Sequence, residues 1–271
     1  MSKAKILFIG CGNMGGSIVS AIDSHDFDIS VLKPTSPSPH LKPHIHQYYQ
    51  SPDQINQTFD CVVLAVKPQK LSEVGSTVSH LLDSHTLILS IMAGTKSDHI
   101  ASYLGNPNLP VIRIMPNLPV SVGEGISTGF ANSHINARHK DIASRLFKNT
   151  GELIWLESEA QMDAATALAG SGPAYFFLTV EALTSAGVNA GLPEKTAEKL
   201  ARQTLTGAGQ LLKEHKNISA ADYRRQVTSP GGTTEAAIDS LFNSELPRIY
   251  LDAVKAAIKR AQELAQGLTK S

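Results

Sequence analysis

The sequence is poor in cysteine and contains only Cys11 and Cys61 among its 271 residues. Cys11 lies in a glycine-rich segment, and Cys61 lies in a short apolar run that reads as a buried strand. Two cysteines in such places do not suggest the disulfide framework of a secreted protein. We therefore expect a reduced, cytoplasmic protein.

The sequence also lacks an excess of charge and any long apolar run. Lysine plus arginine total 24 and aspartate plus glutamate total 24, so no basic field predicts binding to nucleic acid or to an anionic membrane. No apolar run approaches the roughly 20 residues that span a bilayer. The first strand-like segment begins by Lys5, and we expect no signal peptide before it.

The composition is that of a soluble globular protein, with 42% apolar and 18% charged residues. A chain of 271 residues can bury a large core and is long enough for two domains.

A glycine-rich segment near the N-terminus has the pattern of a nucleotide-binding loop. Residues 4–10 form an apolar run, and residues 17–22 have helical spacing. A strand, a G-x-G-x-x-G loop and a helix in this order are typical of the Rossmann-type dinucleotide-binding fold. The glycines let the backbone approach a pyrophosphate, whose charge then rests at the helix N-terminus. The loop residues predicted to bind the cofactor are Gly10, Cys11, Gly12, Asn13, Met14 and Gly15.

The end of the second predicted strand indicates which dinucleotide is bound. NAD-specific folds usually place an acidic residue there to hold the ribose hydroxyls. Here residues 28–32 are followed by Lys33, Thr35 and Ser36, a cation and two hydroxyls that suit the extra phosphate of NADP. We predict NADPH as the cofactor, with NADH as a weaker alternative. The alternative for Lys33 is a solvated side chain in a proline-rich loop.

Residues 34–46 contain four prolines and three histidines, His40, His44 and His46. The spacing of the histidines permits a metal site, but the stretch has no cysteine and no convincing secondary structure. We predict a surface loop there and no bound metal.

Apolar segments at 60–66, 86–91 and 111–115 read as buried strands with helical segments between them. This alternation predicts a parallel sheet covered on both faces. Residues 125–130 and 152–156 read as further strands that extend the sheet, and an antiparallel pairing is left open. Loops at the carboxyl ends of parallel strands carry the site. One of these loops holds Lys67, which is either a surface charge or a contact to cofactor or substrate.

The second half of the chain reads as helices alone. Residues 162–186 have helical composition, but Pro173 lies among them, so a helix either starts or kinks there. About 110 residues of helix without a sheet make a limited core, so we expect self-association, with a monomeric bundle as the alternative. The predicted domains are an α/β domain at residues 1–157 and an all-α domain at residues 158–271.

A glycine turn before a predicted helix offers a second binding site. Pro230 fixes one φ angle, and Gly231 and Gly232 can adopt backbone angles closed to other residues. The turn leads into a helix near Thr233 and Thr234, where outward amide groups meet the positive end of a helix dipole. Such a site suits a small carboxylate or phosphate. The alternative is an ordinary capped helix start.

Three motifs, at residues 10–16, 167–175 and 227–234, resemble in this order those of the pyrroline-5-carboxylate reductase family. Residues 65–68 and 115–117 also resemble that family, and the similarity runs nearly end to end. The resemblance implies a Rossmann-type NADPH-binding domain and an all-α domain that dimerises by interleaving helices, in a homo-oligomer built from dimers. It implies reduction of the cyclic imine 1-pyrroline-5-carboxylate to L-proline, the last step of proline biosynthesis.

The resemblance also implies roles for single residues. Substrate contacts fall on Thr233 and Thr234, and on Glu159, a helix position where the family has a carboxylate side chain. The backbone amides of Gly231, Gly232 and Thr233 would hold the substrate carboxylate, and the Thr234 hydroxyl would meet the ring nitrogen, which makes Thr234 the catalytic candidate. Cofactor contacts besides the glycine loop fall on Lys33, Ala65, Val66, Lys67, Pro68, Ile91, Met92, Ala93 and Gln226, the last a position that the family usually fills with Asn.

Two other functions are considered. Another imine reductase or a β-hydroxyacid dehydrogenase has the same domain order, but related hydroxyacid enzymes use a lysine on the first long C-terminal helix. Residues 162–191 contain no lysine or arginine, which counts against that chemistry. The non-enzymatic alternative is a sensor that binds NADP without turning it over, and the two intact glycine-rich segments disfavour it.

Overall fold

The computed structural model describes residues 3–268, with side chains through residue 263. The chain forms two compact units, one made of the residues up to 171 together with those from 257 onward, and the other of residues 172–256. The predicted boundary after residue 157 precedes this division because the helical segment that follows contacts strand β7 (Gly125–Ala131) of the first unit.

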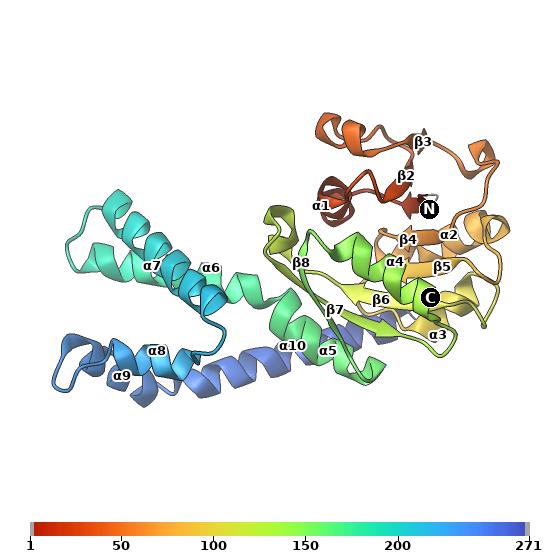
Figure 1. The fold of residues 1–271 in the computed structure, drawn as a ribbon. Coiled ribbons are helices and arrows are strands. Elements are labelled where there is room, and N and C mark those ends of the chain that lie inside the picture. The colour runs from red at the N-terminus through yellow and green to blue at the C-terminus, as the bar shows by residue number, and fades with distance from the viewer. Residues whose placement is uncertain (1–2, 269–271) are drawn as a thin grey trace. The chain divides into compact units, whose positions relative to one another are not determined.

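The first unit is organised around an eight-stranded sheet of order β3-β2-β1-β4-β5-β6-β7-β8 (Figure 1). Neighbours from β3 to β6 pair in parallel, β7 pairs antiparallel with β6, and β8 pairs in parallel with β7. The first six strands have the order of a Rossmann-type fold, which confirms the predicted α/β class. The other strands are β1 (Ala4–Ile9), β2 (Phe27–Leu32), β3 (Gln47–Tyr49), β4 (Cys61–Leu64), β5 (Leu87–Ser90), β6 (Val111–Met115) and β8 (Gly151–Trp155).

Both faces of the sheet are covered, which explains why its strands are apolar without alternation. On β1, Ile6 and Phe8 belong to a core shared with helices α1 and α4. The alternate residues Leu7 and Ile9 belong to a core shared with α2 and α3 on the opposite face. These helices are α1 (Asn13–Ala21), α2 (Leu71–Val78), α3 (Ser97–Tyr103) and α4 (Ala137–Phe147).

The predicted surface loop at residues 34–46 contains more structure than its composition indicated. Pro39–His44 form the 3-10 helix η1, which buries Leu41, and the unpredicted strand β3 lies beside β2 at the sheet edge. A strand of three residues is too short to show a periodic pattern. Among the described residues, no group of three or more His, Cys, Asp or Glu side chains is placed to hold a metal ion. The other 3-10 turns are η2 (Pro52–Gln54), η3 (Pro68–Lys70), η4 (Ser79–Leu81), η5 (Leu118–Val122) and η6 (Glu159–Gln161).

A π-helical turn lies just before Pro173. Helix α5 (Met162–Ala165) leads into the π turn η7 (Thr166–Gly170), where the Ser171 N–H donates to the Thr166 carbonyl over 2.9 Å. Pro173 has no N–H to offer the Ala169 carbonyl four residues earlier. Asn117 Nδ2 donates to that carbonyl instead, over 3.1 Å. A bend at Ser171 follows, and a new helix, α6 (Gly172–Asn189), begins one residue before Pro173, which agrees with the alternative in which a helix starts there.

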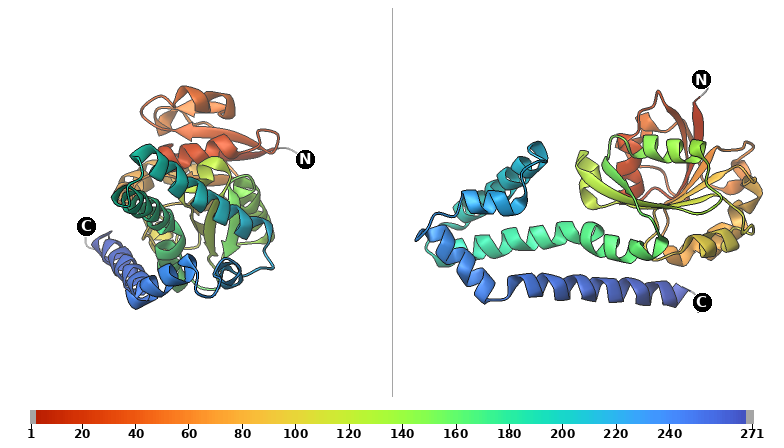
Figure 2. Two further views of the ribbon diagram at one scale, coloured as in Figure 1. Left: turned by 90° about the vertical axis from the view of Figure 1, so that its left-hand side faces the viewer. Right: turned by 60° about the horizontal axis from the view of Figure 1, so that its bottom comes forward.

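The second unit is helical, as predicted. Helices α6 and α7 lie side by side as a hairpin (Figure 2). They approach closely at Gly187, where a Cβ would lie 3.0 Å from that of Ala197. Helix α8 was not predicted. None of the helices within residues 3–268 is both long and apolar enough to cross a membrane. The helices are α6 (Gly172–Asn189), α7 (Glu194–Glu214), α8 (Ala220–Gln226), α9 (Thr233–Asn243) and α10 (Leu246–Leu268), the last of which crosses the division at residue 256.

Most large apolar side chains of this second unit are exposed within the single chain. On α6, Phe176 is 56% exposed and Leu178 is 63% exposed, values typical of a surface rather than a core. Of the apolar residues of α7, Ala197 and Ala201 are buried. This surface is defined here as the apolar face of the second unit: Phe176, Phe177, Leu178, Leu183, Leu200, Leu211, Leu212, Leu241, Phe242, Ile249 and Leu251.

A buried histidine holds the start of α4 in the first unit. The Asn136 side chain accepts from the His139 N–H over 3.0 Å, and His139 Nδ1 accepts in return from the Asn136 N–H over 3.3 Å. His139 Nε2 lies 3.2 Å from the His85 carbonyl, so the neutral ring donates there. Burial lowers the pKa of His139, and the charge of Arg138 acts in the same direction, while the bond to His85 opposes them.

We expect the free energy of unfolding, measured by urea titration, to decrease as pH falls from about 7.5 to 5.5. The unfolded chain, in which histidine titrates near pH ~6.5, takes up the proton before native His139 does, so stability is lost below that pH. His139→Gln keeps an acceptor at this capping position and should reduce the pH dependence. The exposed His46→Gln is the control, and an equal pH dependence in both variants would contradict the assignment.

Candidate active site

The glycine loop after β1 is pressed against the end of β4. Gly10 has a φ of +80°, and a Cβ at that position would lie 2.8 Å from the Ala65 carbonyl oxygen. A Cβ on Gly15 would lie 3.1 Å from the Ala65 Cβ. Glycine is therefore required at position 10 both by the backbone angle and by space. The predicted cofactor residues of the loop and Ala65 are neighbours in the structure.

The N-terminus of α1 is open. Gly12 precedes the helix, and among the described residues no side chain caps its amide groups and no acidic residue lies in the first turn. A Cβ on Gly12 would meet no atom within 4 Å, so its backbone faces free space. The first hydrogen bond within the helix joins the Gly16 N–H to the Gly12 carbonyl over 2.7 Å. The N–H groups of Asn13, Met14 and Gly15 precede this bond and have no acceptor within the helix. This arrangement fits a dinucleotide pyrophosphate.

Lys33 lies half-buried where β2 ends, beside the glycine loop. Its N–H donates to the Tyr49 carbonyl over 3.0 Å, and its carbonyl accepts from the Tyr48 hydroxyl over 2.8 Å, so strand β3 holds it in place. Burial raises the pKa of the Cys11 thiol, and the nearby charge of Lys33 partly opposes that effect. The loop thiol therefore stays neutral.

The remaining predicted cofactor segments lie at the same edge of the sheet. Val66, Lys67 and Pro68 follow the end of β4, and Lys67 is exposed at the start of η3. The next segment continues from β5, because the Ile91 N–H donates to the Leu64 carbonyl over 3.2 Å. Within that segment Met92 is buried, while Ala93 is exposed. The carboxyl ends of β1, β2, β4 and β5 thus gather the predicted cofactor contacts of the first unit.

Glu159, predicted as a substrate contact, has both carboxylate oxygens engaged inside the first unit. Its Oε1 accepts from the Ser97 N–H and from Arg113 Nη1, each over 2.7 Å. Its Oε2 accepts from the Ser97 hydroxyl over 3.0 Å. The Glu159 carboxylate therefore links Ser97 to Arg113 within the protein, a contact that the sequence resemblance did not indicate.

The glycine turn of the second unit has the predicted shape, but two of its amides donate hydrogen bonds within the protein. Gly231 has a φ of +69°, and its N–H donates to Glu235 Oε2 over 2.7 Å. The Gly232 N–H donates to the Ser229 carbonyl over 3.0 Å. Two of the three amides that were expected to hold a substrate carboxylate, those of Gly231 and Gly232, thus have acceptors within the protein. The reach of Glu235 follows from its place three residues after the N-cap glycine, a capping-box position that sequence reasoning did not use.

The amides left at the start of α9 are those of the next three residues. The first ladder bond joins the Ala236 N–H to the Gly232 carbonyl over 3.2 Å, so the N–H groups of Thr233, Thr234 and Glu235 precede the ladder. Thr234 is half-buried and Thr233 is exposed. Gln226, at the end of α8 in the same unit, is exposed.

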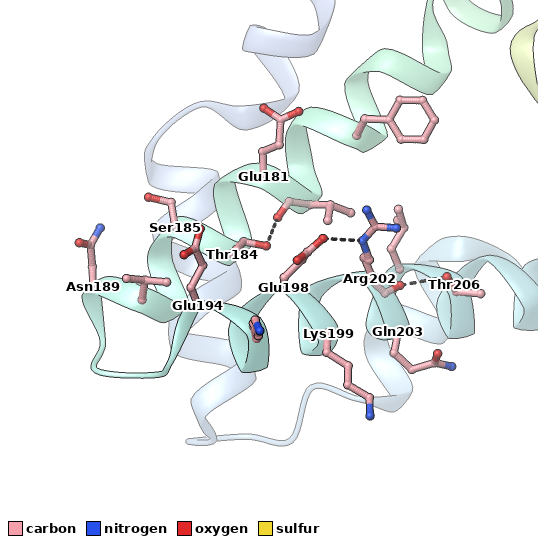
Figure 3. A pocket seen from close by; sticks show the side chains of 15 residues that line it. Glu181, Thr184, Ser185, Asn189, Glu194, Glu198, Lys199, Arg202, Gln203 and Thr206 are labelled. Carbon is pink, nitrogen blue, oxygen red and sulfur yellow. Dashed lines mark hydrogen bonds and ion pairs between the residues drawn. The ribbon is translucent and has the colours of Figure 1, made fainter.

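A large groove of about 1220 Å³ between α6 and α7 contains none of the predicted site residues (Figure 3). Its charges are partly paired along α7, where Arg202 Nε donates to Glu198 Oε1 over 3.0 Å. The Thr206 hydroxyl donates to the Arg202 carbonyl over 3.0 Å. The groove is thus lined by charged, polar and apolar side chains together and lacks the glycine turns that were predicted to form the site.

Comparison with protein families assigns both parts of the chain. Residues 159–264 match the family described as pyrroline-5-carboxylate reductase dimerisation. Residues 5–94, which contain the glycine loop, match the family described as NADP oxidoreductase, coenzyme F420-dependent.

Several known proteins are similar over nearly the whole chain. A pyrroline-5-carboxylate reductase of Pseudomonas aeruginosa is 37% identical, and the match covers 99% of each chain. A solved pyrroline-5-carboxylate reductase of Coxiella burnetii has a TM-score of 0.88 and 36% identity, covering 97% of this chain and 99% of the other. A pyrroline carboxylate reductase of Plasmodium falciparum, solved with NADP bound, has a TM-score of 0.82 and 27% identity, covering 98% and 99%.

Two glycine substitutions in the loop distinguish its effect on NADPH binding from its effect on the stability of the fold. Gly12→Ala adds a methyl group to free space, so we expect it to change the free energy of unfolding by less than about 1 kcal/mol. It should weaken NADPH binding, measured by fluorescence titration, at least about tenfold, because the methyl group occupies the position that a pyrophosphate approaches.

The matched variant Gly10→Ala should instead lower mainly the free energy of unfolding. Its backbone angle and its clash with Ala65 predict a loss of about 1–3 kcal/mol in the free energy of unfolding. If Gly12→Ala binds NADPH as tightly as the unmodified protein, the cofactor does not lie against this backbone.

Proposed function

The chain belongs to the pyrroline-5-carboxylate reductase family, and we propose that it holds NADPH at the glycine loop of its first unit while it reduces 1-pyrroline-5-carboxylate to L-proline. The assignment of the cofactor site rests on the open N-terminus of α1, where a Cβ on Gly12 would meet no atom within 4 Å. The assignment of the substrate rests on the match of residues 159–264 to the family described as pyrroline-5-carboxylate reductase dimerisation.

NADPH supplies the hydride when it is bound, and the protein supplies placement and electrostatics. The amides of Thr233 and Thr234, which precede the α9 ladder, are the donors we assign to the substrate carboxylate. Glu235 shapes this turn by accepting from Gly231. Gly231 and Gly232 therefore contribute to substrate binding through the shape of the turn.

The Thr234 hydroxyl is the group that we assign to the ring nitrogen. It both donates and accepts a hydrogen bond, but a threonine is too weak an acid to protonate an amine by itself at neutral pH. The imine therefore either binds in its protonated form or draws its proton through Thr234 Oγ1 from water. A positive charge on the ring nitrogen makes the adjacent carbon more electrophilic, so positioning accounts for most of the acceleration.

Lys33 is the residue that we assign to selection of NADPH over NADH. The end of β2 has a half-buried cation and no acidic side chain in residues 33–36, which suits an extra phosphate on the ribose. The backbone of Lys33 is held on both sides by β3, so the start of its side chain is fixed.

We assign the apolar face of the second unit to self-association in a homo-oligomer built from dimers. Side chains such as Phe176 and Leu178, which are more than half exposed in the single chain, need a cover that a second copy provides. Both cysteines are free, and Cys11 and Cys61 are buried, which suits the reducing interior of the cytoplasm.

The test of function is a spectrophotometric assay with 1-pyrroline-5-carboxylate and each nicotinamide cofactor in turn. We expect NADPH to be consumed and proline to form. Binding of NADPH without its consumption would favour a sensor, and NADP-linked oxidation of a hydroxyacid would favour the rival enzyme class.

For Thr234→Ala we expect kcat/KM for the imine to decrease at least about tenfold, which corresponds to about 1.4 kcal/mol of transition-state binding. Thr234→Ser restores the hydroxyl group and should recover most of the loss. Kinetics close to those of the unmodified enzyme in Thr234→Ala would remove this hydroxyl from the mechanism.

For Lys33→Ala we expect KM for NADPH to increase about fivefold or more while KM for NADH changes less than about twofold. The reason is that only NADPH has the phosphate that the cation attracts. Lys70→Ala, which removes an exposed cation paired with Glu73, is the control. Equal effects on the two cofactors would contradict the assignment of Lys33.

A further inference from the structure

We propose that Glu159 is a positioning residue, which fixes the loop of residues 91–96 in the cofactor site through Ser97 and does not contact the substrate. The inference rests on the proposed NADPH site, because residues 91–93 of this loop belong to that site. It assigns to Glu159 a task that is separate from the substrate contact implied by the resemblance.

The geometry joins three segments that are far apart in the sequence. Glu159 lies in η6, Ser97 is the first residue of α3, and Arg113 is in β6. The Glu159 carboxylate accepts three hydrogen bonds, two from Ser97 and one from Arg113, with lengths between 2.7 and 3.0 Å. One side chain therefore ties the start of a helix to the middle of the sheet.

The carboxylate caps the first amide of α3, while Asp98 within the helix accepts from the His99 N–H over 2.8 Å. Lys96 occupies the N-cap position and makes no side-chain cap. Glu159 accepts from the Ser97 N–H at this helix start, where a negative charge is favourable. The position at which the loop of residues 91–96 enters α3 is thus fixed by a side chain 62 residues further along the chain.

The other end of the same loop is fixed by the sheet. The Ile91 N–H donates to the Leu64 carbonyl over 3.2 Å, and the Met92 N–H donates to Ser90 Oγ over 3.3 Å. Between the two anchors, Gly94 has a φ of +71°. A shift at Ser97 is therefore taken up by the few residues that the site uses, among them the exposed Ala93.

A buried charge keeps Glu159 in place. The Arg113 side chain is only 6% exposed, and its Nε has no hydrogen-bond partner among the described residues. Glu159 is 2.7 Å from Arg113 Nη1, so a movement of the carboxylate would leave a buried guanidinium without this counter-ion. The pair therefore makes Glu159 a fixed support for Ser97.

The test compares the binding of NADPH with the use of the imine in the full-length protein. Glu159→Gln removes the charge, Glu159→Asp keeps it on a shorter arm, and Ser97→Ala removes one hydrogen bond. We expect Glu159→Gln to increase both the Kd of NADPH, measured by fluorescence, and its KM by about fivefold or more, with KM for the imine within about twofold. Ser97→Ala should increase the Kd by about two- to threefold, and Glu159→Asp should lie between the unmodified protein and Glu159→Gln.

Asn136→Ala is the matched control, because it also removes a side chain that caps a helix, at α4, where Asn136 accepts from the His139 N–H over 3.0 Å. It should lower the melting temperature and leave the Kd of NADPH unchanged within about twofold. A Kd that is unchanged in both Glu159→Gln and Ser97→Ala would overturn the inference and leave a purely structural role. A selective increase in KM for the imine would overturn it in favour of substrate contact.

Three further outcomes decide between the inference and the proposed function. If Glu159→Gln does not fold, Ser97→Ala alone decides, and an unchanged Kd in that variant overturns the inference. If the unmodified protein binds NADPH but does not reduce the imine, the proposed activity fails while the Kd comparison still decides the role of Glu159. If the unmodified protein does not bind NADPH, both proposals fail.

Discussion

The close approach of Gly10 to the end of β4 is the constraint on which the candidate cofactor site depends. A side chain there would lie 2.8 Å from the Ala65 carbonyl oxygen, so the chain can leave β1 and enter α1 only through glycine. This turn places the open helix start at the edge where β2, β4 and β5 also end. Lys33 and the residues after β4 and β5 reach the site because the parallel strands deliver them to that edge.

The sequence predicted the layers of the fold well, because strands buried on both faces are continuous apolar runs between helices. It predicted the strand, glycine loop and helix at the N-terminus for a similar reason, since the three are contiguous in the chain. The three-residue strand β3 carried too little pattern. The partners of Glu159 were beyond reach, because Ser97 and Arg113 come from other elements and meet it only in the folded chain. The substrate and cofactor roles of single residues remain predictions.

Two polar side chains hold the helical segment after β8 against the sheet. Asn117 bonds the Ala169 carbonyl that Pro173 leaves without a donor, and Glu159 pairs with buried Arg113. Each meets a group that would otherwise be costly to bury, a carbonyl in one case and a guanidinium in the other. The beginning of the helical region is therefore fixed by directional bonds, whereas the second unit beyond it buries few of its large apolar side chains.

The exposed apolar face of the second unit has a consequence for how the protein behaves as its amount in the cell changes. A unit whose helices are completed by another copy draws its stability from mass action, so dilution weakens it even when no residue is altered. Under the proposed self-association, a defective copy occupies the place of a sound one in the same particle. With random pairing, damage to half of the molecules then places a defective copy in more than half of the dimers.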